Sequence, residues 1–386
     1  MAVETHKCEV VPIVLEKHPD ADRLSVVRIY NFQVVVNTAD WQGVEKAAYV
    51  QPDSVMPDTP EYRWLKNTPT LRKMRDGLND FVLAGVKPDD YDQQLAAIET
   101  KIDANTKYLR ITVRKLRGII SMGMLILAPE GSQIGDDVAE QLGITHYEPP
   151  TMEELEGSRR HTGDDVAPSP LLIYAPTYDV ESAYKYASAF EAGEPVYVSE
   201  KIDGQNARYV STLGENEHTV QPGLGWRDTK LYTFHAGSHK EWKLKIGGSN
   251  WWKAIEQNSW IEEWMITNPE YVLYGECYGW VQPLKYGAKQ GQLFFRAFDV
   301  LRGTEYMDAE EFIATLPEEH RVPSFGIMPF DFEKFQKLAD GQSLVPGANN
   351  AREGIVIKPL KERQHWKLGR VMIKLVSNSY LEKSAR

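Results

Sequence analysis

The chain has 386 residues, of which 42% are hydrophobic and 26% charged, a composition typical of a globular protein with two domains. Its two cysteines argue against a disulfide framework or a cysteine-rich metal site, and no apolar run approaches the roughly 18–20 residues of a membrane span. The first residues carry no apolar core of a secretion signal, so we expect an intracellular protein with no membrane partner.

The net charge of −11 argues against a nucleic-acid partner, but the charge is unevenly distributed. Residues 104–129 contain five Lys or Arg and no acid, and residues 351–386 have a local balance of +6. These basic segments are compatible with a phosphate-bearing partner. In the first of them, Arg110, Arg114 and Lys115 are candidates for contacts with nucleic-acid phosphates.

Residues 1–146 are predicted to form one domain of short strands. Segments such as "LSVVRIYN" and "FQVVVNTA" are rich in Val, Ile and Tyr, and "YLRITVRKLRGIISMGMLILA" predicts two more strands joined at Gly118 or near Ser121. Residues 69–104 are polar and mixed, which indicates an insertion with a helix at "DQQLAAIETKI". Short strands in this number favour a small barrel of the oligonucleotide-binding (OB) type.

Residues 147–170 contain several prolines and acids and are predicted to be an interdomain linker. A second domain is predicted over 171–386. It mixes helical segments ("DVESAYKYASAF", "WWKAIEQNSWIEEWM", "EEFIATL") with strand segments ("YVLYGECY", "QLFFRAFDV", "GIVIKPL", "VMIKLV"), which is typical of an α+β domain.

The stretch "VSEKIDGQNARYV" contains a lysine, Lys201, with two interpretations. The preceding residues alternate like a half-buried strand, and Asp203-Gly204 favours a turn, so the local pattern predicts a hairpin with a surface lysine at its mouth. Alternatively, Lys201 is a nucleophile. A lysine attacks phosphorus only when deprotonated, and its reference pKa is about 10.4, so it needs burial or a nearby cation to lower that pKa.

The later strands supply the groups that such a nucleophile needs. A nucleotide-binding lysine requires carboxylates for a divalent ion, cations for the phosphates and an aromatic ring for the base. Singly, each candidate is more often structural, because a glutamate beside a turn is usually solvated and a strand phenylalanine is usually core. Together and in this order, they favour the catalytic interpretation. The candidates are Glu276 in "YGECYG", Phe298 in "FFRAFDV", Glu353 and Lys358 in "REGIVIKP", and Lys374 in "VMIKLV".

These segments resemble the covalent nucleotidyltransferase superfamily of polynucleotide ligases and capping enzymes. "KIDGQN" is similar to the K-x-D-G nucleophile motif, and "LYGECYG", "FFRAFDV", "EGIVIKP" and "VMIKLV" are similar to the motifs that follow it, in the same order. Within the superfamily, the sequence looks like the ATP-dependent, nick-sealing RNA ligases of the branch with an N-terminal OB-like domain. "HPDADRLSVVRI" also resembles the opening of tRNA-binding OB modules. The implied fold is α+β, an OB-like barrel followed by a nucleotidyltransferase domain of antiparallel sheets with flanking helices.

The resemblance also implies roles for individual residues. Lys201 would attack the α-phosphate of ATP and hold AMP, beside Asp203 and the catalytic metal, Mg²⁺ or Mn²⁺. The other implied roles are metal and phosphate contacts for Asn206, the ribose for Glu276, the adenine for Phe298 and Glu200, the metal's waters for Glu353, and the phosphates for Lys358 and Lys374.

Two positions depart from the family pattern. Related ligases often have a second lysine two positions after the last motif lysine, and here that position is Val376. The arginine expected after the first motif is not obvious. His239 or Lys240 in "FHAGSHKEWK" is the best candidate for this nucleic-acid contact, and Arg208 or Arg227 is the alternative.

The sequence therefore predicts an ATP-dependent RNA ligase that joins 3′-hydroxyl and 5′-phosphate ends, of RNA or of RNA and DNA, at nicks in a duplex. We expect a monomer. Two alternatives stay open. One is a DNA ligase or capping-type nucleotidyltransferase, and the other is a non-catalytic nucleic-acid-binding protein with the same fold.

Overall fold

The computed structural model of this chain describes residues 6–147, 166–167, 174–213, 232–245 and 249–384. Internal contacts divide the chain into an N-terminal unit that extends to Pro149 and a C-terminal unit from Pro150 to Tyr380, with the last six residues grouped with the first unit. The predicted linker lies outside the described residues, apart from residues 147, 166 and 167, so its boundaries stay a prediction. None of the helices in the described ranges has the length and apolar composition of a membrane span.

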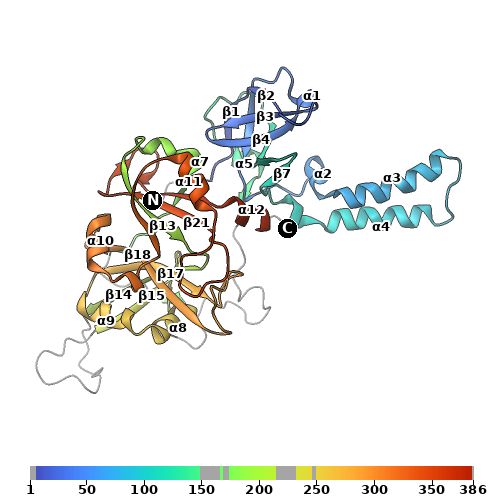
Figure 1. The fold of residues 1–386 in the computed structure, drawn as a ribbon. Helices are drawn as coiled ribbons and strands as arrows, with labels where there is room; N and C mark the ends of the chain where they lie inside the picture. The colour runs from blue at the N-terminus through green and yellow to red at the C-terminus, as the bar shows by residue number, and fades with distance from the viewer. Residues whose placement is uncertain (1–5, 148–165, 168–173, 214–231, 246–248, 385–386) are drawn as a thin grey trace, which may run out of the picture. The chain divides into compact units, whose positions relative to one another are not determined.

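The N-terminal unit contains two three-stranded antiparallel sheets (Figure 1). Their orders are β1–β5–β9 and β2–β3–β4. The second sheet shows the expected alternation, because Phe32, Val34 and Val36 on β4 are buried and the residue after each of them is not. The strands are β1 (Glu9–Pro12), β2 (Leu15–Lys17), β3 (Leu24–Ile29), β4 (Phe32–Asn37), β5 (Lys46–Val50), β6 (Ser54–Val55), β7 (Arg114–Leu116), β8 (Ile119–Ser121), β9 (Met124–Leu127) and β10 (Thr145–His146).

The segment over 108–128 has three strands rather than the predicted two. β7 and β8 form a hairpin at Arg117-Gly118, whose φ angles of 48° and 89° make a left-handed turn. A second break follows at Gly123, with φ of 93°, where a Cβ would meet the carbonyl oxygen of Val50 at 2.5 Å. The chain then resumes as β9, which pairs with β5.

The insertion over 69–104 is a pair of helices, α3 (Pro69–Leu83) and α4 (Tyr91–Ala104), which lie side by side (Figure 1). The sequence predicted only the second of them. The first begins at Thr68, whose hydroxyl accepts a hydrogen bond from the backbone of Leu71, and Pro69 occupies its first position. The buried residues of both helices form one small core of their own: Leu71, Leu78, Ile98 and Ile102. The shorter helices of this unit are α1 (Thr38–Trp41), α2 (Arg63–Lys66) and α5 (Ala139–Leu142).

The C-terminal unit contains two larger sheets. The seven-stranded sheet has the order β11–β16–β15–β14–β17–β18–β19, and the five-stranded sheet has the order β12–β24–β21–β13–β20. All neighbouring pairs are antiparallel except β12 with β24. The strands are β11 (Val166–Ala167), β12 (Glu181–Ser182), β13 (Pro195–Lys201), β14 (Gln205–Leu213), β15 (Tyr232–Gly237), β16 (Trp242–Lys243), β17 (Val272–Gly279), β18 (Leu293–Arg302), β19 (Glu305–Tyr306), β20 (Ser324–Pro329), β21 (Gly354–Pro359), β22 (Gln364–His365), β23 (Gly369–Arg370) and β24 (Ile373–Val376).

Helices cover one face of the seven-stranded sheet, and two polar side chains point to the other face. Tyr209 and Phe295 pack against α8 (Asn250–Gln257) and α9 (Trp260–Thr267) in one hydrophobic core. Because side chains alternate along a strand, Asn206 on β14 and Glu276 on β17, which are directly paired, point to the opposite face. The remaining helices are α7 (Ala183–Tyr186), α10 (Ala309–Thr315), α11 (Phe332–Ala339) and α12 (Asn378–Ser384).

Candidate active site

Lys201 is the last residue of β13, at the point where the chain passes from one sheet of the C-terminal unit to the other. β13 pairs with β20 and β21, whereas β14 pairs with β15 and β17. The predicted hairpin is therefore wrong, because the two strands around Lys201 belong to different sheets. The prediction of a half-buried strand is also wrong, since residues 196–200 are buried on both faces.

The turn after Lys201 brings the nucleophile motif against β17. Gly204 has no room for a side chain, because a Cβ there would meet the carbonyl oxygen of Cys277 at 2.5 Å and the side chain of Glu276 at 2.8 Å. The backbone N–H of Asp203 donates to the hydroxyl of Tyr286 at 2.7 Å. The glycine of K-x-D-G therefore allows Lys201, Asp203 and Glu276 to lie together.

A carboxylate holds the lysine in place. Nζ of Lys201 donates to Oε1 of Glu353 at 2.6 Å, and 27% of the lysine side chain is exposed. Burial disfavours the charged ammonium, but Glu353 and Glu276 outweigh this effect and raise the pKa of Lys201 above its ordinary value. In the nucleotide-free protein the lysine is therefore a charged partner of carboxylates, and it needs a further cation to become a nucleophile.

The carboxylates around Lys201 disfavour each other's ionised forms. Burial raises the pKa of Asp203 to about 6, and the charge of Glu353 adds to this effect. Burial also raises the pKa of Glu276 to about 8, although Lys201 opposes the shift. A cation bound between these carboxylates would stabilise their ionised forms, so the site favours binding one.

The residues present fit a divalent ion. Oδ2 of Asp203 and Oε2 of Glu353 are buried and lack a hydrogen-bond donor among the described residues. In the described part of the chain no three acidic, histidine or cysteine side chains form a ready-made metal cage. A hydrated Mg²⁺ or Mn²⁺ needs no such cage, because it keeps most of its waters and uses one or two carboxylates.

Lys374 lies on the same face of the five-stranded sheet as Lys201. It pairs with Val356 of β21, which in turn pairs with Ser199 of β13. Burial lowers the pKa of Lys374 below its ordinary value, and the nearby charge of Lys201 lowers it further. Val376 lies on the same face, because it pairs with Gly354, which pairs with Lys201. A second lysine at this position would therefore be level with Lys201 across the sheet.

Lys358 is also on this face but belongs to a buried ion-pair network. Its ammonium lies 3.4 Å from Oδ1 of Asp299, a fully buried carboxylate that also accepts from Arg370 and from the hydroxyl of Tyr178. Burial raises the pKa of Asp299, but the cations of Arg370 and Lys358 outweigh it and hold that pKa below its usual range. The network joins β18 to β21 and thus links the two sheets. The predicted contact of Lys358 with phosphates stays a prediction.

Glu200 and Phe298 differ in how they are placed. The Glu200 carboxylate points away from Lys201 and accepts hydrogen bonds from the Ser343 hydroxyl and the Leu344 backbone, both at 2.6 Å. Burial raises its pKa. Phe298 is half-buried and packs in two small apolar clusters, whereas Phe295 is buried in the core under α8 and α9. The contacts of Glu200 and Phe298 with adenine stay predictions.

The candidates for the nucleic-acid contact after the first motif lie on the turn between β15 and β16. His239 is hydrogen-bonded to the carbonyl oxygen of Tyr178 at 3.3 Å, and Lys240 is exposed. Arg208, the alternative, is buried and donates to the carbonyl oxygens of Ser238 and Ala175. Its hydrogen bond to Ser238 therefore stabilises this turn. Arg227 lies outside the described residues.

The basic residues of the N-terminal unit also have different surroundings. Arg110 forms an ion pair with Asp53 at 2.5 Å. Arg114 and Lys115 are exposed on β7, and the Lys115 ammonium forms a long ion pair at the surface, 3.5 Å from the Glu382 carboxylate. Both basic residues of β7 can thus reach a phosphate, whereas Arg110 has a structural partner.

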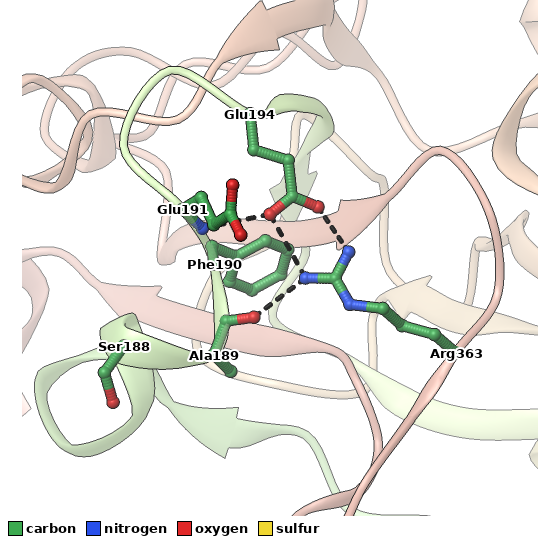
Figure 2. Close-up of a pocket in the computed structure, with 6 residues that line it drawn as sticks. All are labelled: Ser188, Ala189, Phe190, Glu191, Glu194 and Arg363. Atoms are coloured by element: carbon green, nitrogen blue, oxygen red, sulfur yellow. Dashed lines mark hydrogen bonds and ion pairs between the residues drawn. The ribbon is translucent and has the colours of Figure 1, made fainter.

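A surface pocket at the other end of β13 is separate from this site (Figure 2). Arg363 forms an ion pair with Glu194, which directly precedes β13, and donates to the carbonyl oxygen of Ala189 at 2.8 Å. Its polar groups are therefore engaged with one another. Phe190 closes one side, with the Arg363 guanidinium 5.1 Å from its ring centre.

Sequence reasoning missed three residues that support the site: Asp299, Tyr286 and Tyr380. Tyr380 donates to Oδ1 of Asp203 at 3.4 Å from 177 positions away. A buried aspartate inside the apolar strand "FFRAFDV" was the one visible signal, since an acid there requires a cationic partner. The tyrosines gave no signal, because tyrosine is common in strands and loops.

Comparison with known proteins agrees with this architecture. Residues 194–376 match the model of the RNA ligase family, and residues 9–87 match that of an OB-fold domain. A search of curated proteins finds no match. Among solved structures, a Naegleria gruberi RNA ligase variant with ATP and Mn is 20% identical, with a TM-score of 0.66 over 98% of each chain. Another with AMP and Mn is 22% identical, with a TM-score of 0.66 over 97% of this chain and 98% of that one. An apo variant is 21% identical, with a TM-score of 0.66 over 100% of both.

The fold is thus an N-terminal OB-fold domain followed by a ligase adenylation domain, as the sequence predicted. The match over 194–376 places the C-terminal domain of this chain in the RNA ligase family.

Proposed function

We propose that this protein is an ATP-dependent RNA ligase that joins a 3′-hydroxyl to a 5′-phosphate, at nicks in a duplex. The observation that carries the proposal is the Lys201 ammonium, 2.6 Å from Glu353 and within the field of Asp203 and Glu276 at the end of the K-x-D-G strand. A Naegleria gruberi RNA ligase of the same fold has been solved with ATP and Mn, which supports the choice of nucleotide and metal.

Three displacements at phosphorus make up the proposed reaction. Nζ of Lys201, once deprotonated, forms a bond to the α-phosphorus of ATP as the bond to pyrophosphate breaks. An oxygen of the 5′-phosphate then attacks the AMP phosphorus and releases the Lys201 amine. Finally, the 3′-hydroxyl oxygen attacks the 5′-phosphorus, loses its proton and releases AMP. Each step needs an in-line geometry and stabilised charge more than covalent help from the protein.

The side chains divide these tasks. Glu353 and Asp203 would hold Mg²⁺ or Mn²⁺, which supplies positive charge beside the lysine and the α-phosphate. Lys374, which shares a sheet face with Lys201, would bind phosphate oxygens and lower the barrier at the transition state, because the anionic phosphates favour its ammonium form. Glu276 would accept from the ribose, and Phe298 would stack on adenine.

The test is transfer of label from α-labelled ATP to the protein, with wild type and Lys201→Ala compared on a denaturing gel. We expect label on wild type alone, lost in acid and stable in alkali, as for a phosphoramidate. Label from GTP or NAD instead would favour a capping-type enzyme or another ligase. Absence of label with all three nucleotides would favour the non-catalytic nucleic-acid-binding protein.

The choice of ends needs its own measurement. Nicked duplexes with RNA or DNA on the 3′-hydroxyl side separate an RNA ligase from a DNA ligase, and single strands test the need for a template. We expect sealing to be fastest with RNA at the 3′-hydroxyl side of a nick. Equal or faster sealing of an all-DNA nick would contradict the proposal.

A further inference from the structure

The loop between β17 and β18, residues 280–292, is positively charged and directly follows the glutamate motif. Its sequence, "WVQPLKYGAKQGQ", contains Lys285 and Lys289, and there is no acid anywhere between Glu276 and Asp299. In a protein with a net charge of −11, an acid-free stretch of this length marks a local attraction for anions.

Several contacts fix this loop against the nucleophile motif. The hydroxyl of Tyr286 accepts from the backbone of Asp203 at 2.7 Å, and the side-chain amide of Gln282 donates to the carbonyl oxygen of Gly204 at 3.5 Å. Tyr286 also packs with Ile202 in one apolar cluster. Residues on the loop are thus held next to the end of β13.

Trp280 and Lys285 are paired at the surface of this loop. The Lys285 ammonium lies 4.5 Å from the centre of the Trp280 ring, a cation–π contact, and 37% of Trp280 is exposed. Within the described residues, neither Lys285 nor Lys289 has a carboxylate within 4.0 Å. An exposed indole beside uncompensated ammonium groups is the combination that binds single nucleic-acid strands, through base stacking and phosphate contacts.

We propose that Trp280 and Lys285 bind the RNA strand beside the ends being joined. The indole stacks on an unpaired or end base, and Lys285, with Lys289, contacts the adjoining phosphates. RNA is favoured over ATP because the nucleotide has its own proposed aromatic partner in Phe298 and its own cation in Lys374. This inference rests on the proposed function, since it assigns the substrate contact of the same site.

The experiment measures RNA affinity separately from nucleotide attachment. Binding of a fluorescent nicked duplex with RNA on the 3′-hydroxyl side is followed by anisotropy, in EDTA so that no chemistry occurs. Trp280→Ala is expected to weaken binding about 10-fold, and Trp280→Phe, which keeps a stacking ring, to recover most of the affinity. Lys285→Ala is expected to lower the salt dependence of binding by about one phosphate contact.

Trp366 supplies the matched control. It is also an exposed tryptophan with a lysine over its ring, Lys367 at 4.6 Å, but it follows β21 at the end remote from Lys201. Trp366→Ala is expected to bind RNA within about twofold of wild type, because one indole outside the site adds little to the affinity. An equal loss in both variants would overturn the specific role of Trp280.

Lysyl-AMP formation from α-labelled ATP, measured on the same protein preparations with a divalent ion in place of EDTA, separates the two hypotheses. If wild type takes up no label, the proposed function fails. If wild type takes up label but Trp280→Ala binds RNA like wild type, only this inference fails. A rise in the ATP concentration needed for labelling, with RNA binding unchanged, would reassign the pair to the nucleotide and would also overturn the inference.

Discussion

Oε1 of Glu353 lies 2.6 Å from the ammonium of Lys201, although 152 positions separate the two residues. The pairing depends on β21 running antiparallel to β13, with Gly354 directly opposite Lys201. The contact keeps the pKa of Lys201 above its ordinary value, even though burial acts in the other direction. The same carboxylate therefore positions the proposed nucleophile and favours its protonated form, and we expect a cation that competes for Glu353 to release it.

Replacing Glu353 by Gln separates these two effects. The amide removes the negative charge that raises the pKa of Lys201, but it also removes a carboxylate that fits a divalent ion. We expect the rate of lysyl-AMP formation to fall about 100-fold at neutral pH, because charge stabilisation at the α-phosphate outweighs the gain in free amine. Glu311→Gln, in a surface ion pair with Arg302, is the control and should leave the rate unchanged. A faster Glu353→Gln enzyme at neutral pH would mean that the carboxylate only restrains the lysine.

The pH dependence of lysyl-AMP formation should respond to divalent ions. Without enough metal, Lys201 keeps its raised pKa, so the rate should still be increasing at alkaline pH. A bound cation near Glu353 and Asp203 disfavours the ammonium and should move the midpoint to lower pH as Mg²⁺ or Mn²⁺ is added. The measurement is the single-turnover rate against pH at several metal concentrations. A midpoint independent of metal concentration would contradict this account.

The residues proposed to carry the chemistry were predictable, because each lies in a short motif within or directly beside a strand. Lys201, Asp203, Glu276 and Glu353 are brought together as their motifs predicted. Their partners were less accessible to sequence reasoning. The hairpin predicted from Asp203-Gly204 failed because a local turn signal does not reveal that β21, more than 150 positions later, competes for pairing with β13.

Buried polar residues show the same dependence on distant partners. Lys358 and Arg208 both looked available for phosphates, yet Asp299 pairs with the first and backbone carbonyl groups accept from the second. Sequence alternation gives the face of a strand but not what covers it. In the insertion, α3 was not predicted because only two of its residues, Leu71 and Leu78, are buried. Its sequence is mostly polar, so the apolar periodicity that indicates a helix is weak.

Glu276 should make stability depend on pH. Burial raises its carboxyl pKa from 4.5 to about 8, so between these values the folded protein binds a proton that the unfolded chain has lost. Stability should therefore fall as pH rises from about 4.5 to 8 and change little above that range from this group. Glu276→Gln removes this titration. In EDTA, the unfolding free energy of Glu276→Gln minus that of wild type should therefore be more positive at pH 8 than at pH 5. The expected change is on the order of 2 kcal/mol, a value reduced because the side chain is partly exposed. Urea unfolding at both pH values tests this, and an equal difference at both would contradict it.

The ion-pair network around Asp299 should contribute strongly to the free energy of unfolding, provided that all of its charged members are present. Asp299→Ala leaves Lys358 buried without its Asp299 partner and leaves Arg370 paired with Glu362 alone, which costs about 3–5 kcal/mol of unfolding free energy. Arg302→Ala, which breaks an exposed pair with Glu311, should cost less than about 1 kcal/mol. Chemical denaturation of both variants provides the comparison, and similar costs would show that the buried network is no more important than a surface pair.

The three basic residues predicted to bind nucleic acid should separate into two kinds. Arg114 and Lys115 are exposed on β7, so their double alanine variant should weaken RNA binding and reduce the salt dependence of log Kd by about one to two phosphate contacts. Arg110 is paired with Asp53 and stacks on Tyr147, so Arg110→Ala should lower the unfolding free energy of the N-terminal unit by about 1–2 kcal/mol. Anisotropy across a salt series and denaturant unfolding measure the two effects. Each phosphate that a cation neutralises releases counterions and so steepens the dependence of log Kd on log salt concentration. An unchanged slope in the double variant would therefore show that β7 does not contact the RNA.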